Sequence, residues 1–127
     1  QRTIKLIVLG KKELDFCNLK TEEILSIVEP LMQNCLDGSN EDNYEKHTLN
    51  FTERMKRMVT PHELKRQLSN RPRIYFWERQ FIELFRRVDA IAVVWKQSVS
   101  SCDDELINQA IFKEEEGKIL IDHCMIC

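Results

Sequence analysis

The sequence predicts an α/β domain: a small three-layer sandwich in which helices cover both faces of a mainly parallel, Rossmann-like sheet of three or more strands. Two observations predict this fold. Short apolar, β-branched runs alternate with segments of helical periodicity, and such alternation implies right-handed crossovers between parallel strands. The 127 residues are 43% hydrophobic and 31% charged, which supplies one core. We therefore expect one domain over residues 1–127, either complete or a piece of a larger protein.

Three apolar segments are the predicted strands. Residues 3–9 read Thr-Ile-Lys-Leu-Ile-Val-Leu, and residues 90–95 read Ala-Ile-Ala-Val-Val-Trp. Both runs are almost continuously apolar, which is typical of strands sheltered on both faces. A third strand is expected at residues 119–121, where the sequence reads Ile-Leu-Ile.

Helical patterns occupy the first long interval. Thr21 is the expected N-cap of a helix that ends at residues 37–40, and Pro30 is expected to kink or split it. Residues 37–48 read as an acidic polar loop. A short helix is expected around residues 51–59, with basic side chains on one side.

Three more helical segments follow. Thr60-Pro61-His62-Glu63 is a capping box, with threonine at the N-cap, proline at the first helical position and glutamate at the third, and it begins a short helix. Apolar residues at helical spacing predict a helix over residues 76–88. The same reasoning predicts a helix through residues 106–111 that ends at Gly117.

Charge is segregated along the chain. Residues 53–87 hold ten basic and four acidic side chains, whereas the two flanking thirds are acidic and bring the net charge to -2. Arginine outnumbers lysine in the middle segment, and its planar fork suits bidentate contact with carboxylate or phosphate. Arginine with neighbouring aromatic residues is also typical of protein-interface hot spots and of single-strand nucleic-acid grooves. The predicted partner-binding residues are Arg54, Arg57, Lys65, Arg66, Arg71, Arg73, Tyr75 and Arg79.

Two short stretches resemble parts of nucleotide-binding proteins. Residues 6–10 (Leu-Ile-Val-Leu-Gly) are similar to the first strand of a nucleotide-binding α/β domain, and residues 88–94 resemble the fourth strand of a Ras-like GTPase. The glycine-rich loop with its lysine and hydroxyl, which would hold phosphate and magnesium, is missing after Gly10. The resemblance therefore implies a pseudo-enzyme that does not bind a triphosphate in the usual way.

No motif in the chain predicts a metal or cofactor. Cys124 and Cys127 form a single CxxC beside His123, but zinc needs four ligands and a redox CxxC needs a helix N-terminus. Five cysteines, an odd number, indicate a reducing compartment, either cytoplasm or nucleus. No apolar run is long enough to cross a membrane.

These observations favour a non-catalytic intracellular domain that binds a protein partner with an acidic surface, as a subunit or module of a larger complex. A second reading is a nucleic-acid-binding domain with a degenerate nuclease-like or GTPase-like fold. A third is a small enzyme whose carboxylates lie at the strand ends; they would be Asp15, Asp103, Asp104 and Asp122. The sequence names neither the partner nor the oligomeric state.

Overall fold

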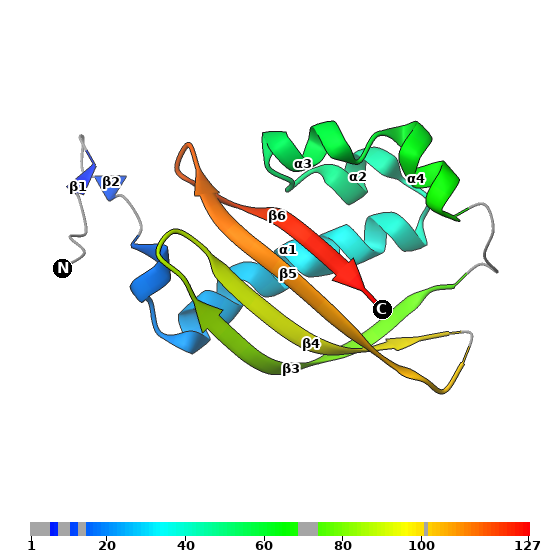
Figure 1. Ribbon diagram of the computed structural model, residues 1–127. Helices are drawn as coiled ribbons and strands as arrows, with labels where there is room; N and C mark the ends of the chain where they lie inside the picture. The colour runs from blue at the N-terminus through cyan, green and yellow to red at the C-terminus, as the bar shows by residue number, and fades with distance from the viewer. Residues whose placement is uncertain (1–5, 8–10, 13–14, 69–73, 101) are drawn as a thin grey trace.

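A four-stranded antiparallel sheet forms the centre of the molecule (Figure 1). The computed structural model describes residues 6–7, 11–12, 15–68, 74–100 and 102–127. The strands follow one another in the order β3-β4-β5-β6, and each is antiparallel to its neighbour. Their bounds are β3 (Phe76–Arg86), β4 (Ile91–Val99), β5 (Glu105–Glu115) and β6 (Lys118–Ile126). The predicted parallel three-layer sandwich is therefore wrong, and with it the resemblance to a nucleotide-binding sheet.

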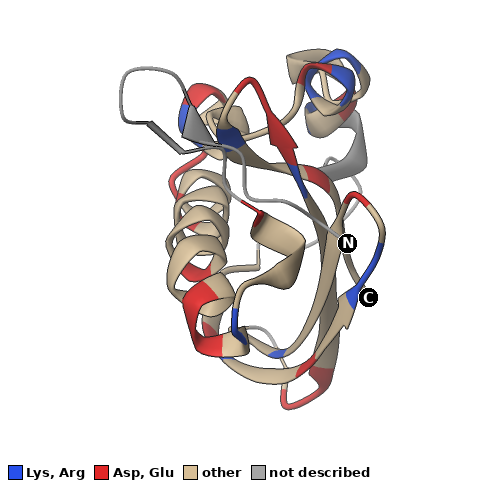
Figure 2. Ribbon diagram, turned by 90° about the vertical axis from the view of Figure 1, so that its left-hand side faces the viewer, with Lys and Arg blue, Asp and Glu red and all other residues tan. Residues whose placement is uncertain are grey.

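Helices cover one face and one edge of this sheet. The long helix α1 (Thr21–Asn40) follows a short 3-10 turn, η2 (Phe16–Asn18), and lies against one face, as Figure 2 shows from the side. The short helices lie beyond β6; they are α2 (Tyr44–Thr48), α3 (Glu53–Met58) and α4 (Pro61–Leu68) (Figure 1). Within the described residues no helix covers the other sheet face, so the domain has two layers rather than three. None of the described helices is both long and apolar enough to cross a lipid bilayer.

The core lies between α1 and the covered face of the sheet. Ile24, Val28 and Met32 of α1 are fully buried at the spacing of one helical face. Opposite them, Trp95 and Phe112 are also fully buried and meet edge to face with ring centroids 6.2 Å apart.

The predicted helix over residues 76–88 is strand β3, which corrects the sequence interpretation. Two β-bulges interrupt its pairing with β4, one between Phe76 and Arg79 and one between Phe81 and Glu83. Each bulge adds one residue to the strand, so the side chains that face α1 are separated by three and two positions in turn. The apolar residues that predicted the helix were Trp77, Phe81, Leu84, Phe85 and Val88, but only Phe81 and Leu84 pack against the core, whereas the other three are exposed. The three-residue step from Phe81 to Leu84 across the second bulge, combined with apolar residues on the exposed face, imitates the period of an amphipathic helix.

The predicted helix near residues 106–111 is likewise wrong, because the segment lies in β5. Asn108, Ala110 and Phe112 all face the core at a spacing of two residues. Because the first of them is polar, the two-residue period of apolar residues that indicates a strand is hidden in the sequence. Gly117 does not end a helix. Glu116 and Gly117 have positive φ angles of 53° and 81°, as a two-residue turn between antiparallel strands requires.

Several other elements are confirmed. Both the strand at residues 90–95 and the strand at residues 119–121 are present, and each is longer than predicted. α1, α3 and α4 also lie where expected, and Thr60 Oγ1 accepts the Glu63 N–H at 3.1 Å, as a capping residue should.

The details of α1 and the following loop differ from expectation. Pro30 lies within one uninterrupted helix, whose N-cap is Lys20 rather than Thr21. The predicted loop over residues 37–48 instead holds the end of α1 and all of α2. Gly38 allows the two helices to meet, because a Cβ atom there would stand 2.3 Å from the backbone nitrogen of His47.

Little of the predicted first strand can be compared with the structure. β1 (Leu6–Ile7) pairs antiparallel with β2 (Lys11–Lys12), and neither joins the four-stranded sheet. The rest of residues 3–9 lies outside the described residues.

Candidate interaction surface

The short helices α3 and α4 carry a group of exposed cations. Arg54, Lys56 and Arg57 of α3 and Lys65 of α4 are all exposed, and we call these four residues the basic surface. Met55 points the other way and is buried. α3 thus has one apolar anchor and presents its cations to solvent.

α3 begins where it does because of Thr52, which also connects the helix to the sheet. Thr52 Oγ1 accepts the N–H of Met55 at 3.3 Å and donates to Asp122 Oδ1 of β6 at 2.7 Å. Phe51 lies beside Ile121 in an isolated parallel bridge. The chain therefore passes along the outer edge of β6 immediately before it turns into α3.

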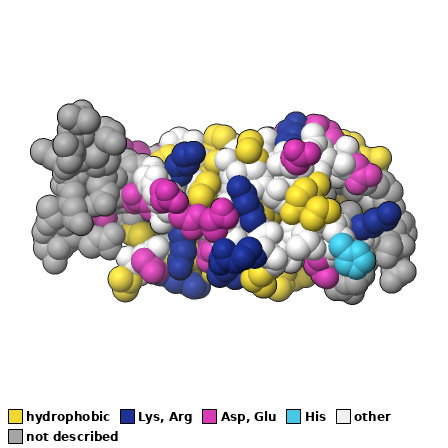
Figure 3. Space-filling view, turned by 90° about the horizontal axis from the view of Figure 1, so that it is seen from above, with side chains coloured by type: hydrophobic (Ala, Val, Ile, Leu, Met, Phe, Trp, Pro, Cys, Tyr) yellow, Lys and Arg dark blue, Asp and Glu magenta, His cyan; other side chains and the backbone are white. Residues whose placement is uncertain are grey.

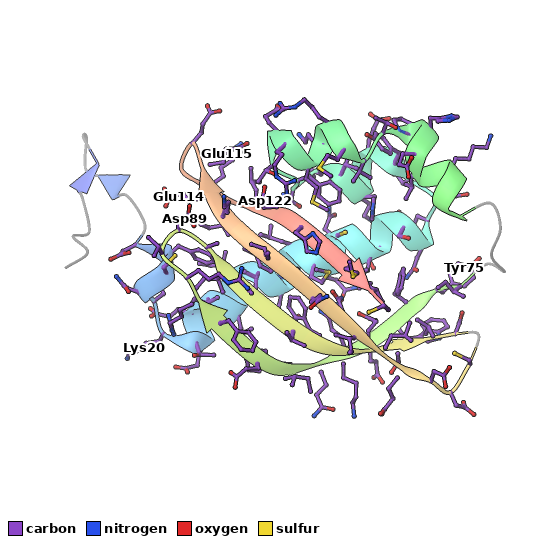
Figure 4. The ribbon with its side chains drawn as sticks, viewed as in Figure 1. Lys20, Tyr75, Asp89, Glu114, Glu115 and Asp122 are labelled. Atoms are coloured by element: carbon purple, nitrogen blue, oxygen red, sulfur yellow. The ribbon has the colours of Figure 1, made fainter. Side chains whose placement is uncertain are left out.

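Arg54 is the member of the basic surface that contacts the sheet. Its Nε lies 3.1 Å from Asp122 Oδ1, and its guanidinium also donates to the Asp122 carbonyl oxygen. Figure 4 labels Asp122 on β6. Burial alone would raise the pKa of Asp122, but the hydrogen bonds from Arg54 and Thr52 outweigh burial and hold that pKa below its ordinary value.

The other three cations are not engaged in this way. Within the described residues, no ion pair joins Lys56, Arg57 or Lys65 to an acidic side chain. Exposed hydrophobic side chains lie on the same short helices and their linker: Leu49 is 61% exposed and Met58 is 63% exposed. Figure 3 shows both hydrophobic and acidic side chains among the cations on this side of the molecule. The surface therefore combines positive charge with apolar area.

Arg79, which the sequence grouped with the partner-binding residues, is engaged inside the fold. Its side chain is 7% exposed, and its guanidinium pairs with Glu29 of α1 at 2.6 Å. It also lies over the ring of Trp95, with 5.6 Å between the guanidinium carbon and the ring centroid. Because β3 turns residue 79 toward α1, this arginine joins the helix to the sheet.

The remaining predicted residues are Tyr75, Arg66, Arg71 and Arg73. Tyr75 is 40% exposed and immediately precedes β3, and its backbone is bonded to Ser100 (Figure 4). Arg66 lies within α4, while Arg71 and Arg73 lie outside the described residues. Among the predicted residues whose side chains the structure describes, Arg54, Arg57 and Lys65 therefore lie on α3 and α4.

The carboxylates expected at the strand ends do not converge. Asp103 and Asp104 belong to the turn between β4 and β5, whereas Asp122 lies within β6 against α3. Asp15 is buried beside η2 and accepts a hydrogen bond from Asn18 at 2.7 Å. An antiparallel sheet sends consecutive loops to opposite ends, so the rule that placed these residues together does not apply.

Cys124 of β6 and Cys127, which follows β6, lie on opposite faces of the sheet. Cys124 pairs with Ala110 on the covered face, while Cys127 pairs with Ile107 on the other. Cys35 of α1 meets Cys124 inside the core, and their hydrogen bond, together with burial, raises the pKa of the Cys35 thiol. A protonated buried thiol is unreactive. In the part of the chain that is described, no group of three candidate ligands is arranged to hold a metal ion.

His47 of α2 is a partly buried side chain next to this thiol. Its Nδ1 lies 2.8 Å from the Cys35 carbonyl oxygen, to which it can donate, and its ring meets Phe51 edge to face. Burial lowers the pKa of His47 below its ordinary value of 6.5, and the bond to Cys35 offsets only part of that effect.

We predict that acid weakens the packing of α2 on α1. The folded state binds the His47 proton less readily than the unfolded state, so the stability contributed by His47 is present above pH 6.5 and is lost as the pH falls through the depressed folded pKa. Unfolding midpoints in urea at pH 7.5 and pH 5.5 should therefore differ more for the natural chain than for His47→Gln. Equal pH dependence of the two proteins would contradict the assignment to His47.

By its fold the protein is a two-layer domain in which one long helix packs on a four-stranded antiparallel meander. Its short helices carry a surface that is basic and partly apolar. Comparison with known proteins found no matching family model, no matching curated protein and no matching solved structure. Sequence reasoning found the cations but not Leu49 and Met58, because a helix-face pattern does not tell which apolar side chains stay exposed.

Proposed function

We propose that this domain is a non-catalytic protein–protein interaction module of the cytoplasm or nucleus, which binds an acidic partner through the basic surface. One observation carries the proposal: Lys56, Arg57 and Lys65 are exposed and unpaired within the described residues, next to exposed apolar side chains. Apolar area among cations favours a protein partner over nucleic acid, since phosphate contacts need charge alone. The five cysteines, all thiols, support a reducing compartment.

The test is a charge reversal that spares the fold. Arg54 is left unchanged because it binds Asp122. The variant Lys56→Glu/Arg57→Glu/Lys65→Glu should lose partner binding by at least about tenfold, which is about 1.4 kcal/mol. The matched control is Lys20→Glu/Arg87→Glu/Lys118→Glu, which changes the net charge equally at exposed positions outside α3 and α4. Its binding should equal that of the natural chain.

The measurement is a pull-down from cell extract with and without nuclease treatment, at two salt concentrations, followed by titration of the recovered partner. A protein retained by the natural chain and the control but lost by the charge-reversed variant supports the proposal. Equal retention by all three proteins refutes it. Recovery of nucleic acid alone, lost after nuclease and at high salt, would replace the protein partner by nucleic acid.

A further inference from the structure

The two edge strands of the sheet, β3 and β6, differ in how far their outward backbone groups are already hydrogen-bonded. β3 is the edge that is less open to pairing with another strand. Asn40 of α1 bonds both the N–H and the C=O of Phe76, each at 2.9 Å, in the manner of a neighbouring strand. The outward N–H of Leu84 is bonded at 2.9 Å by the carboxylate of Glu83. With the two bulges of β3, these contacts leave this edge poorly suited to another strand.

At the other edge, the first half of β6 is also occupied. Ile121 donates its N–H to Asn50 at 2.7 Å and accepts the N–H of Thr52 at 2.9 Å. The next carbonyl, that of Asp122, accepts from Arg54. The residues leading into α3 thus fill the position that a fifth strand would take beside Ile121.

The second half of β6 is open. Ile107 and Cys127 exchange two backbone hydrogen bonds, of 2.8 and 3.0 Å, which fixes the alternation of the antiparallel ladder. By that alternation the N–H and C=O groups of Cys124 and Ile126 point away from β5. Nothing in the described part of the chain bonds these four groups. Residues 123–127, which we call the β6 edge, contain no Lys, Arg, Asp, Glu or Pro to discourage pairing.

We propose that the β6 edge binds an extended segment of the acidic partner, which adds to the sheet as a fifth strand. This inference rests on the proposed function and names the form that the partner takes. Only an extended backbone supplies donors and acceptors at the spacing of Cys124 and Ile126. Met125, 47% exposed on the uncovered face, offers an apolar neighbour, so alternate side chains of the bound segment are apolar.

Charge at one end of the β6 edge specifies the flank of the bound segment. A strand beside Cys124 and Ile126 lies in line with the Asn50–Thr52 backbone, and about 10 Å of extended chain separates positions 121 and 124. At that end stands α3 with Arg54, Lys56 and Arg57. The bound segment therefore carries acidic residues on that flank. Residues 123–127 of a second copy of this chain would contain no acidic residue. An acidic segment of a different protein therefore fits the β6 edge better than a second copy does.

The critical variant is Ile126→Pro. Because the N–H of Ile126 points away from β5, proline there removes an edge donor without removing a bond between β5 and β6. Ile126 also packs against the core, so Ile126→Ala is the matched control: it loses the side chain but keeps the N–H. Both variants should show the far-UV circular dichroism of the natural chain.

The probe is a library of random dodecapeptides displayed on phage, selected against the natural chain, with the enriched peptides then synthesised and titrated. We expect alternating apolar residues with an acidic flank, and binding at least about tenfold weaker to Ile126→Pro than to Ile126→Ala. Amide hydrogen exchange should slow at Cys124 and Ile126 when peptide binds. Equal binding by the two variants, or no enriched peptide, would overturn the strand addition.

The two proposals fail in different ways. If peptides bind the Lys56→Glu/Arg57→Glu/Lys65→Glu variant normally but not Ile126→Pro, the β6 edge stands and the basic surface does not. If charge reversal alone abolishes binding, the reverse holds. Sedimentation without peptide gives the last outcome: a dimer that Ile126→Pro dissociates would assign the β6 edge to a second copy and overturn the partner segment.

Discussion

Replacing Glu29 by alanine is expected to destabilise the domain by about 3 kcal/mol, because it leaves a buried guanidinium without its counter-ion. Arg79 is 7% exposed and donates to Glu29 through two atoms, Nε to Oε1 at 2.9 Å and Nη2 to the backbone oxygen at 2.9 Å. The other carboxylate oxygen of Glu29 accepts the Trp95 indole N–H at 2.8 Å. Alanine removes both carboxylate bonds at once.

The measurement is urea unfolding followed by circular dichroism. Glu29→Gln is the control, since it keeps one carbonyl acceptor and the side-chain length while removing the charge, and it should cost less than Glu29→Ala. A loss below about 1 kcal/mol for Glu29→Ala, the size of an ordinary exposed ion pair, would show that Arg79 reaches solvent instead. Folded Glu29→Gln should bind the partner normally, because Arg79 belongs to the joint between α1 and the sheet.

The sequence correctly predicted those segments in which the local pattern of apolar residues matches the side chains that are buried in the fold. In α1, Ile24, Val28 and Cys35 lie on one helical stripe and all three are buried. Thr60 and Glu63 form the expected start of α4. In β4 the apolar run matched a strand because its covered face holds Ile91 and Val93 and its other face holds Ala92. Nothing outside these segments was needed to define them.

The fold class failed where distant residues decide the structure. Bulges in β3 depend on pairing with β4, and the buried Asn108 in β5 is satisfied by Gln97, whose Oε1 accepts from it at 3.1 Å. Neither partner is adjacent in the sequence. When residues 76–88 and 106–111 are assigned to helices, every remaining strand is separated from the next by a helix. The rules for such alternation then predict a parallel sheet, so the wrong fold class follows from the two wrong elements.

The candidate site divides in the same way. Exposed Lys56, Arg57 and Lys65 on short helices follow from local pattern, since Met55 and the caps fix the orientation of α3. The inward turn of Arg79 follows from the register of β3, which no local pattern shows. The β6 edge is visible only in the sheet, because it depends on which strand lies last and on what covers it.

Trp95→Ala is expected to cost about 4 kcal/mol, since it removes the largest fully buried side chain and leaves a cavity. Trp95 fills the space between α1 and β5, touches Phe112 edge to face, donates to Glu29 and lies under Arg79. Trp95→Phe keeps an aromatic ring there and loses only the N–H and part of the volume, so its loss should be smaller. Urea unfolding of both variants gives the comparison.

The energetic coupling between Glu29 and Trp95 is a sharper test of how α1 is attached to the sheet. Trp95 and Arg79 share Glu29, so the Glu29→Ala and Trp95→Ala losses should not add; the double variant should fall short of their sum by more than about 0.5 kcal/mol. Additive losses would mean that Glu29 serves the two side chains independently. Because the shared carboxylate lies on α1 and its partners on β3 and β4, a measured coupling would locate the attachment of the helix layer to the sheet. The basic surface and the β6 edge contain none of these three residues, so the proposed binding requires no change in that attachment.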